Sequence, residues 1–262
     1  MSATIAWQMF GADFLKLRKR IGNVGFALLI AYGPLLIFFI VRAAQHSSNP
    51  LTHGAAGGVE GFSDGIRLIA AIFGPLAAIL IGTDAGAGDT SAGVFRDLVV
   101  TGRSRVALFA SRVPAAIGLT WLIALGGYAL LLIGTYAFAS GAPTPGGSLI
   151  FQGLLFELFS TGVVCAVAVG FASLTASRPG ALTTLIGWQL IASPLLASIT
   201  SLGASRRLIL SQAIFHFSPV RLGDGGHGID VSLGTATAVI VTLGWLALFL
   251  ALGAWRTATM DS

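Results

Sequence analysis

Few residues in this sequence are of types that carry out chemistry. The four histidines match no common metal-ligand spacing, and no cysteine or acidic partner stands close to them: His46, His53, His216 and His227. The single cysteine, Cys165, cannot form an internal disulfide. No nucleotide-binding motif of the form GxxxxGK(S/T) is present. We therefore expect no metal site and no cofactor on this chain, and we interpret the histidines as solvated loop residues.

A polar island, residues 89–112, separates two apolar runs that are each long enough to cross a bilayer. Apolar side chains within it recur at helical spacing: Val94, Phe95, Leu98 and Val99. Arg96 and Asp97 face the other way, so the pattern predicts a short amphipathic helix.

Residues typical of helix ends flank this short helix. Those at its start are N-cap types: Asp89, Thr90 and Ser91. Thr101-Gly102 suits its end, and Ser104 can cap the next helix.

The composition is that of a membrane protein. The chain has 262 residues, of which 55% are hydrophobic and only 10% charged, whereas a soluble domain carries about a quarter charged residues. Mean hydropathy is +0.88. The net charge of +5 is concentrated at the ends of apolar runs, which indicates membrane topology and not a surface for nucleic acid. No cleavable signal peptide is evident.

We therefore expect an all-α polytopic membrane protein with a single domain, residues 1–262. Six apolar segments predict its transmembrane helices: residues 21–41, 66–83, 113–139, 149–175, 181–202 and 234–255.

Two further segments are expected to lie along the membrane surface or within one leaflet. Residues 3–20 place four large apolar side chains on one helical face before a basic end, which predicts an amphipathic interfacial helix: Trp7, Phe10, Phe14 and Leu17. Residues 203–233 contain an apolar stretch too short to span, which predicts a re-entrant outer segment.

Basic residues predict the orientation. With the N-terminus inside, ten of the 15 Lys and Arg residues are cytoplasmic: Lys16, Arg18, Lys19, Arg20, Arg96, Arg103, Arg105, Arg112, Arg178 and Arg256. This bias follows the positive-inside rule and places the island and both termini in the cytoplasm.

The island resembles the cytoplasmic loop of the type-2 family of ABC transporter permeases. The matching landmarks are an acidic residue, a glycine, two apolar pairs, a Ser-Arg pair and a final basic residue: Asp89, Gly93, Val94-Phe95, Leu98-Val99, Ser104-Arg105 and Arg112. The sequence departs from the family in having Asp for Glu, Gly102 for Pro and Arg for Lys. In that family the loop is a coupling helix, here residues 89–105, which docks on a separate ATPase. The resemblance thus implies a coupling set: Asp89, Gly93, Val94, Phe95, Arg96, Asp97, Leu98, Arg103, Ser104, Arg105 and Arg112.

The resemblance implies a non-enzymatic permease subunit of an ATP-driven exporter. Its partners would be ABC ATPase subunits that hold ATP and Mg, a second permease copy, identical or related, and membrane lipid, with no nucleic acid. A hydrophobic or amphipathic cargo, such as a drug, antibiotic or lipid, would leave through the plasma membrane, which we expect to be a bacterial inner membrane. Two alternatives stay open: a non-transporting sensor or immunity protein on the same frame, and a membrane-embedded enzyme.

Glu157 is the one acidic residue expected well inside a transmembrane segment, about two turns into residues 149–175. A carboxylate in hydrocarbon is costly, so it should face the bundle interior and pair, or take up a proton. It is either a polar contact on the transport path or a structural hydrogen bond between helices.

Overall fold

The computed structural model describes residues 3–93, 104–220 and 231–259, and this part of the chain contains helices and no strand. The elements run in the order α1 (Ala3–Lys19), α2 (Ile21–Ser48), α3 (Gly58–Ile66), η1 (Arg67–Phe73), α4 (Gly74–Ser91), α6 (Arg105–Ala137), α7 (Gly147–Thr175), α8 (Arg178–Gly187), η2 (Trp188–Ala192), α9 (Ser193–Ser198), η3 (Thr200–Leu208), α10 (Leu210–Phe215) and α11 (Thr235–Thr259).

Six helical stretches are long and apolar enough to cross a membrane. They are Ile21–Ser48, Gly58–Ser91, Arg105–Ala137, Gly147–Thr175, Arg178–Ser198 and Thr235–Thr259. The second joins α3, η1 and α4 into one continuous span, and the fifth joins α8, η2 and α9. The prediction of an all-helical polytopic membrane protein is therefore confirmed.

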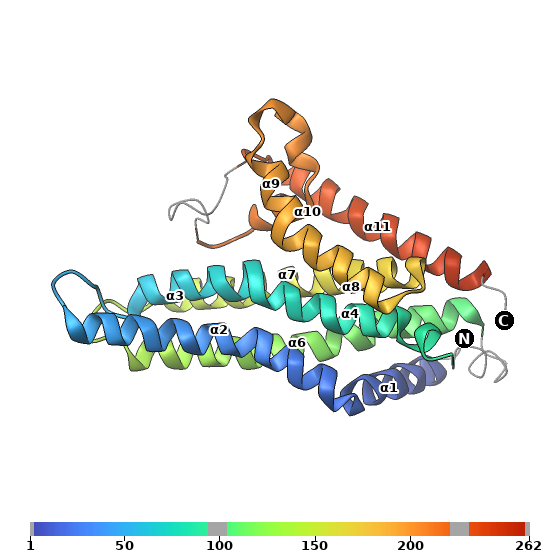
Figure 1. Cartoon of the computed structure of the whole chain (residues 1–262), viewed down its shortest axis with the longest axis horizontal. Coiled ribbons are helices and arrows are strands. Elements are labelled where there is room, and N and C mark those ends of the chain that lie inside the picture. Colours follow the sequence, from blue (N-terminus) through green and yellow to red (C-terminus); the bar gives the residue numbers. More distant parts are fainter. Residues whose placement is uncertain (1–2, 94–103, 221–230, 260–262) are drawn as a thin grey trace.

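The bundle has two distinct ends (Figure 1). At the end on the right, which we call the terminal end, α1 begins, α4 ends, α6 begins and α11 ends, and the chain passes from α7 to α8. At the opposite, distal end, the α2–α3 and α6–α7 connections lie together, and the Gly57 amide donates to the Phe138 carbonyl at 2.8 Å.

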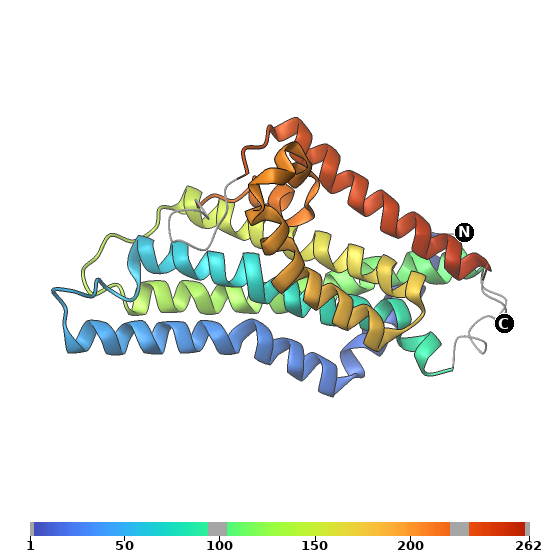
Figure 2. The same cartoon turned by 45° about the horizontal axis from the view of Figure 1, so that its top comes forward.

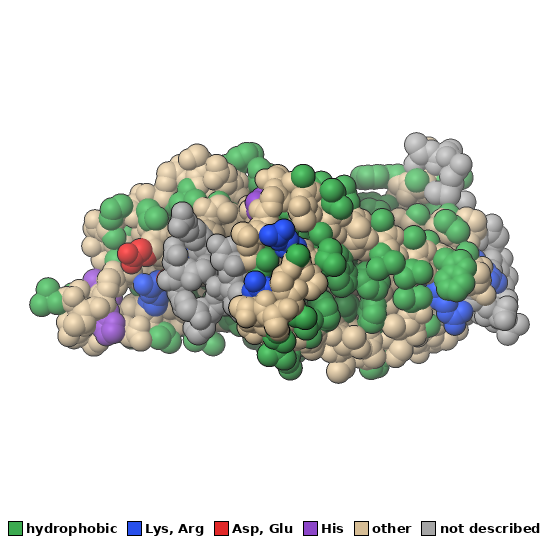
Figure 3. All heavy atoms as spheres, turned by 90° about the horizontal axis from the view of Figure 1, so that it is seen from above, with side chains coloured by type: hydrophobic (Ala, Val, Ile, Leu, Met, Phe, Trp, Pro, Cys, Tyr) green, Lys and Arg blue, Asp and Glu red, His purple; other side chains and the backbone are tan. Residues whose placement is uncertain are grey.

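The fifth and sixth spans diverge from the other four. Figures 1 and 2 show that α8–η2–α9 and α11 rise away from the bundle and meet through η3 and α10 above its middle, short of the distal end. Seen from that side, hydrophobic side chains gather over the right-hand half, where α8 and α11 lie (Figure 3).

Close backbone contact joins α4 and α7, the most extensively packed pair of helices. A Cβ atom at Gly82 would meet the Cys165 carbonyl at 2.7 Å, and one at Gly86 would overlap the Val169 carbonyl. Small residues allow such approach where lipid supplies no hydrophobic drive between helices. The α4–α7 pair is thus the rigid centre of the bundle.

The first helix packs differently from the expected surface helix. Leu17 is buried, and Phe10 and Phe14 pack against the core, where they lie next to Gly118 of α6. Of the four large apolar side chains on the predicted face, only Trp7 is largely exposed, at 73%. Most of the apolar face of α1 therefore packs against α6 and not against the surroundings.

Two helix boundaries bear on the sequence prediction, which was wrong at the first and right at the second. α4 continues to Ser91, so Asp89, Thr90 and Ser91 form its last turn and not the start of a separate helix. α6 begins at Arg105, directly after the predicted cap Ser104, and so starts before the apolar segment 113–139. In both cases the helix runs beyond the apolar segment, because polar side chains are partnered within the bundle at this end.

Two of the spans contain a widened, π-helical turn. In η1 the Gly74 amide bonds the Ile69 carbonyl, and in η2 the Ser193 amide bonds the Trp188 carbonyl, both over five residues. Such turns release carbonyl groups from the regular ladder, and they occur often at functional sites.

Candidate functional site

The middle of the polar island lies outside the described residues. This applies to Val94, Phe95, Arg96, Asp97, Leu98 and Arg103 of the predicted coupling set. The structure describes the residues on either side. Gly93 follows α4 with a φ of +72°, a conformation that favours glycine. Ser104 caps α6 as expected, accepting a hydrogen bond from the Ala107 amide at 3.2 Å.

The two ends of the island meet in a buried cluster of charges at the terminal end. We call this the ion cluster. It comprises Lys16, Arg20, Asp84, Asp89, Arg112 and Arg178. Its members come from α1, the α1–α2 junction, α4, α6 and α8, so it joins five separate parts of the chain.

Asp89 on the last turn of α4 is the centre of one half of the cluster. Its side chain is almost fully buried, and its Oδ2 accepts a hydrogen bond from Arg112 Nη2 on α6 at 3.0 Å. The Oδ1 atom forms an ion pair with Lys16 on α1 and lies 3.6 Å from Arg20 Nη2. The island therefore begins and ends at two residues that bind each other directly.

Asp84 forms the other half, one and a half turns earlier on α4. It is paired with Arg20, and Arg178 Nε lies 3.2 Å from its Oδ1. Arg178 also donates to Asn23 Oδ1 on α2 at 2.9 Å. Arg20 thus contacts both carboxylates, and α8 is tied to α4 and α2 at its first turn.

A glycine makes room for the shared arginine. A Cβ atom added at Gly88 would overlap the guanidinium of Arg20. Because Gly88 lies between Asp84 and Asp89 along α4, its missing side chain lets one cation reach both carboxylates.

The cluster is costly to bury and costly to break. Two carboxylates and the Arg112 guanidinium have little contact with solvent, so their lost hydration must be offset by the ion pairs. A pair of this kind adds little net stability, but removing one partner leaves a charge without compensation and costs about 3–5 kcal/mol. The ion cluster therefore fixes the relative positions of its helices more than it adds to stability.

Asp13 on α1 lies beside the ion cluster but forms no ion pair with any described residue. Its Oδ2 accepts a hydrogen bond from Ser111 Oγ on α6 at 2.6 Å. Burial raises the pKa of this carboxyl, and the Ser111 hydrogen bond and the charges of Arg112 and Lys16 oppose that effect without cancelling it. Asp13 is thus a proton-sensitive group beside a cluster of fixed charges.

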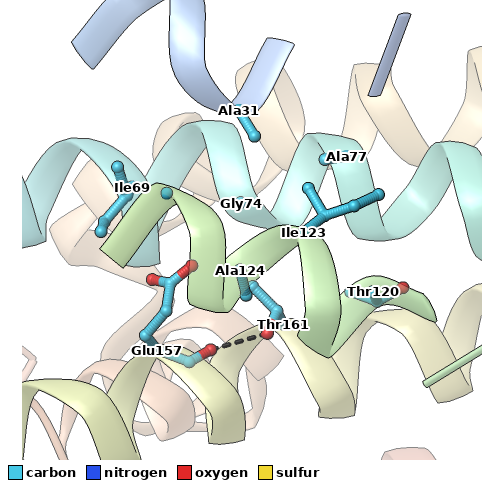
Figure 4. A pocket seen from close by; sticks show the side chains of 10 residues that line it. Ala31, Ile69, Gly74, Ala77, Thr120, Ile123, Ala124, Glu157 and Thr161 are labelled. Atoms are coloured by element: carbon cyan, nitrogen blue, oxygen red, sulfur yellow. Dashed lines mark hydrogen bonds between the residues drawn. The ribbon is translucent and has the colours of Figure 1, made fainter. Parts of the chain in front are cut away.

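Glu157 lies in the middle of the bundle, on α7. Its carboxyl group points from α7 toward η1 and α4, below Ile69 (Figure 4). It is 2% exposed, forms no ion pair with any described residue, and its Oε2 has no hydrogen-bond partner. A Cβ atom at Gly74 would come within 2.9 Å of its Oε1.

The space beside Glu157 is small. The cavity that the carboxyl enters has a volume of about 10 Å³, enough for at most about one water molecule. A buried carboxylate without a cation is unfavourable, so the surroundings suit the protonated, neutral group.

Sequence reasoning found Asp89 and Arg112 but missed their partners. The predicted second span ends at residue 83, which leaves Asp84 just outside it and Glu157 as the one acidic residue well inside a span. In the structure Asp84 is on the span helix and only 3% exposed. The prediction placed Lys16 and Arg20 at the basic end of the interfacial helix and counted Arg178 only as a cytoplasmic charge. The spacing of Asp84 and Asp89 on an otherwise apolar, glycine-rich helix was the available signal.

The three histidines that the structure describes take no part in either site. His46 Nδ1 contacts the His53 carbonyl at 2.8 Å, and His216 contacts the Thr235 hydroxyl at 3.0 Å. His227 lies outside the described residues. Among the described residues no group of three or more His, Cys, Asp and Glu is arranged to hold a metal ion.

The fold and the buried charges define a multi-pass helical membrane protein. Comparison with protein-family models finds none that matches this sequence, and a search of curated proteins finds no match either. Any narrower function therefore has to be argued from the island and from the ion cluster at its ends.

Proposed function

We propose that this chain is the transmembrane permease subunit of an ATP-driven exporter, with ATP and Mg held by a separate ABC ATPase. The proposal starts from the resemblance of residues 89–112 to the coupling loop of type-2 ABC permeases. It includes a second permease copy, a hydrophobic or amphipathic cargo, and a bacterial inner membrane with both termini in the cytoplasm.

The observation that carries the proposal is the direct bond between Asp89 and Arg112. A loop whose ends are held together passes motion to the helices on both sides as one unit. Arg112 Nη2 and Asp89 Oδ2 are 3.0 Å apart, and Lys16 and Arg20 hold the same carboxylate. A push on residues 94–103 would therefore move α4 and α6 as one unit.

The packing supplies a route from that unit into the bundle. α4 packs most extensively on α7, and α6 also packs along α7. Arg105 Nη1 donates to the Ala258 carbonyl at the end of α11, at 3.5 Å. In our proposal ATP-driven closure of the ATPase moves the island, and α4, α6 and α7 respond together.

Phe95 is the residue we expect to anchor the ATPase contact, because buried aromatic side chains dominate such interfaces and their truncation costs about 2 kcal/mol or more. Phe95→Ala should weaken ATPase association or uncouple ATP hydrolysis from transport. The chain would be purified with its partners from its native membrane, and chains carrying a GxxxxGK(S/T) motif would be identified by mass spectrometry. The ATPase activity of the complex would then be measured in vesicles.

The matched control is a charge reversal away from the island. Arg207→Glu suits this purpose because Arg207 is exposed on η3, whereas Arg206 donates to the Ala197 and Gly203 carbonyls. Arg103→Glu should weaken ATPase association and Arg207→Glu should not. If no ATPase copurifies, or if Phe95→Ala and Arg103→Glu both keep wild-type coupling, the exporter function is excluded; copurification of a kinase or a toxin would instead favour a sensor or immunity protein.

A further inference from the structure

The divergence of the fifth and sixth spans leaves a partly open cavity of about 240 Å³. α4 and α7 form one side of it, and α8, η2, α10 and α11 form the other. It lies on a different face of the α4–α7 pair from the Glu157 cavity, and the two share no lining residue.

No charged side chain lines this cavity among the described residues. Its polar side chains are mostly committed to bonds within the protein. Ser160 Oγ donates to the Ala70 carbonyl at 2.7 Å, Gln189 Nε2 to the Ala71 carbonyl at 3.3 Å, and Ser211 bonds Ser193 at 2.6 Å. The two carbonyls belong to the π-helical turn η1. The cavity therefore offers little to an ion or a sugar, and an apolar space of this kind excludes water.

Aromatic rings form much of the wall. They are Phe171, Trp188, Phe215, Trp245 and Phe249. Trp245 contacts Trp188 and Phe249 with centroid distances of 5.8 and 5.5 Å, and its Nε1 donates to the Leu208 carbonyl at 2.9 Å. These contacts hold a row of rings in place across η2 and α11, against which a flat molecule can stack.

The volume sets the size of the occupant. An apolar cavity of about 150 Å³ accommodates one benzene ring, so about 240 Å³ accommodates one or two rings or a comparable length of acyl chain. The helices that bound the cavity carry exposed apolar side chains on their outer faces, among them Ile191 on η2 and Ile240 on α11. The outer faces of the helices on one side of the cavity are therefore suited to contact with bilayer hydrocarbon, and Figure 3 shows hydrophobic side chains gathered over this region.

We propose that this cavity is a binding site for the uncharged, lipophilic part of a molecule taken from the membrane, with a size of one or two rings or a short stretch of acyl chain. Binding at this site does not require an ATPase, so the exporter function and the lipophilic site can fail separately. If the chain is an exporter subunit, the site is placed to hold cargo within a single copy.

Photolabelling of the full-length protein in nanodiscs tests the site. One probe is an uncharged phenyl diazirine, and the other is a phospholipid that carries a diazirine in its acyl chain. Labelled residues would be located by mass spectrometry, with increasing amounts of the same compound lacking the diazirine as competitor. Labelling of lipid-facing residues such as Ile240 rises with probe and is not competed away, whereas labelling on η2, α10 and the inner face of α11 should saturate.

Variants that fill the cavity provide the control. Val167 on α7 is buried in the cavity wall, so Val167→Phe should weaken the competed labelling about tenfold by occupying the space. Ile240→Phe adds the same ring to an outward position, 69% exposed, and should leave the competed labelling unchanged. Val164→Phe fills the same wall and replaces Val167→Phe if that variant does not fold.

The two probes distinguish the sources of the ligand. Competed labelling by the phenyl diazirine assigns the site to small ring compounds, and competed labelling by the phospholipid assigns it to bilayer lipid; either result supports the proposal. Labelling that no competitor reduces, or competed labelling that persists in the cavity-filling variants, overturns it.

Discussion

The ion cluster and the Glu157 site bury the same chemical group in opposite ways. Asp84, Asp89 and Glu157 are each at most 3% exposed. The two aspartates are in contact with cations from α1, α6 and α8, whereas Glu157 forms no ion pair with any described residue. Equal burial therefore does not mean an equal state of charge.

The difference teaches what each carboxyl can do. A carboxylate held by several cations fixes the helices that carry them relative to one another, because its loss removes a shared partner from all of them. A carboxyl without a cation is best accommodated as a neutral group, and it can respond to a ligand, a proton or a movement of α4. Replacing each carboxyl with an amide and comparing the free energies of unfolding tests this difference.

The largest effect is expected from Asp89→Asn. The amide keeps the shape but removes the charge that Lys16, Arg20 and Arg112 share, so the free energy of unfolding should fall by about 3 kcal/mol or more. Unfolding in mixed micelles, followed by circular dichroism, would measure it. A loss below about 1 kcal/mol would mean that solvent already screens these charges.

A double substitution sharpens the same point. Asp89→Leu with Arg112→Leu removes both members of the pair, so it should be less damaging than the sum of the single substitutions, with a coupling of about 1–3 kcal/mol. The same unfolding measurement on the four proteins of the cycle gives this value. Strict additivity would show that the 3.0 Å contact between Arg112 and Asp89 carries no energetic coupling.

Sequence alone predicted the class of fold and only part of the charged site. The six long apolar helices follow from hydropathy, because a bilayer requires about 20 apolar residues per span. The end of α4 did not follow, although the start of α6 after its cap Ser104 did. α4 extends to Ser91 because Asp84 and Asp89 find cations on other helices, and that pairing depends on tertiary contacts.

The surroundings of Glu157, the apolar cavity and the packing of α1 could not be predicted either, because they too depend on tertiary contacts. Glu157 was recognised as buried, but its lack of a cation depends on which helices surround α7. The apolar cavity depends on the divergence of α8 and α11, which hydropathy does not encode. The packing of Phe10 and Phe14 on α6 instead of on lipid likewise could not be distinguished, since both surroundings are apolar.

A smaller effect is expected from Glu157→Gln. Exchanging a neutral carboxyl for an amide of the same shape should change the free energy of unfolding by less than about 1 kcal/mol. The assay is the one used for Asp89→Asn, so the two amide variants are directly comparable. A loss as large as that of Asp89→Asn would mean that Glu157 is ionised and paired, and the contrast between the sites would not hold.

If Glu157 lies on a transport path, the same variant should reveal it. Glu157→Gln would then alter cargo transport in vesicles while assembly and unfolding stay near the wild type. If the residue is structural, Glu157→Leu should lower the folded yield and Glu157→Gln should be harmless. Unchanged transport and yield in both variants would remove Glu157 from either role.

The smallest effect is expected from Asp13→Asn, at the edge of the ion cluster. The pKa of Asp13 is raised from 3.8, chiefly by burial, so the folded state holds this proton more tightly than the unfolded chain does. The stability that the proton contributes is fully present below pH 3.8 and is lost as pH rises through the pKa of the folded state.

Asp13→Asn remains neutral throughout and can still accept the hydrogen bond from Ser111. It should therefore unfold at a slightly higher temperature than the wild type at neutral pH, and the difference should shrink as pH falls toward 3.8. Thermal unfolding followed across this pH range would check both the sign and the trend. A variant that is less stable than the wild type at neutral pH would show that the folded state stabilises the charged form of Asp13, so that its pKa is lowered on folding and not raised.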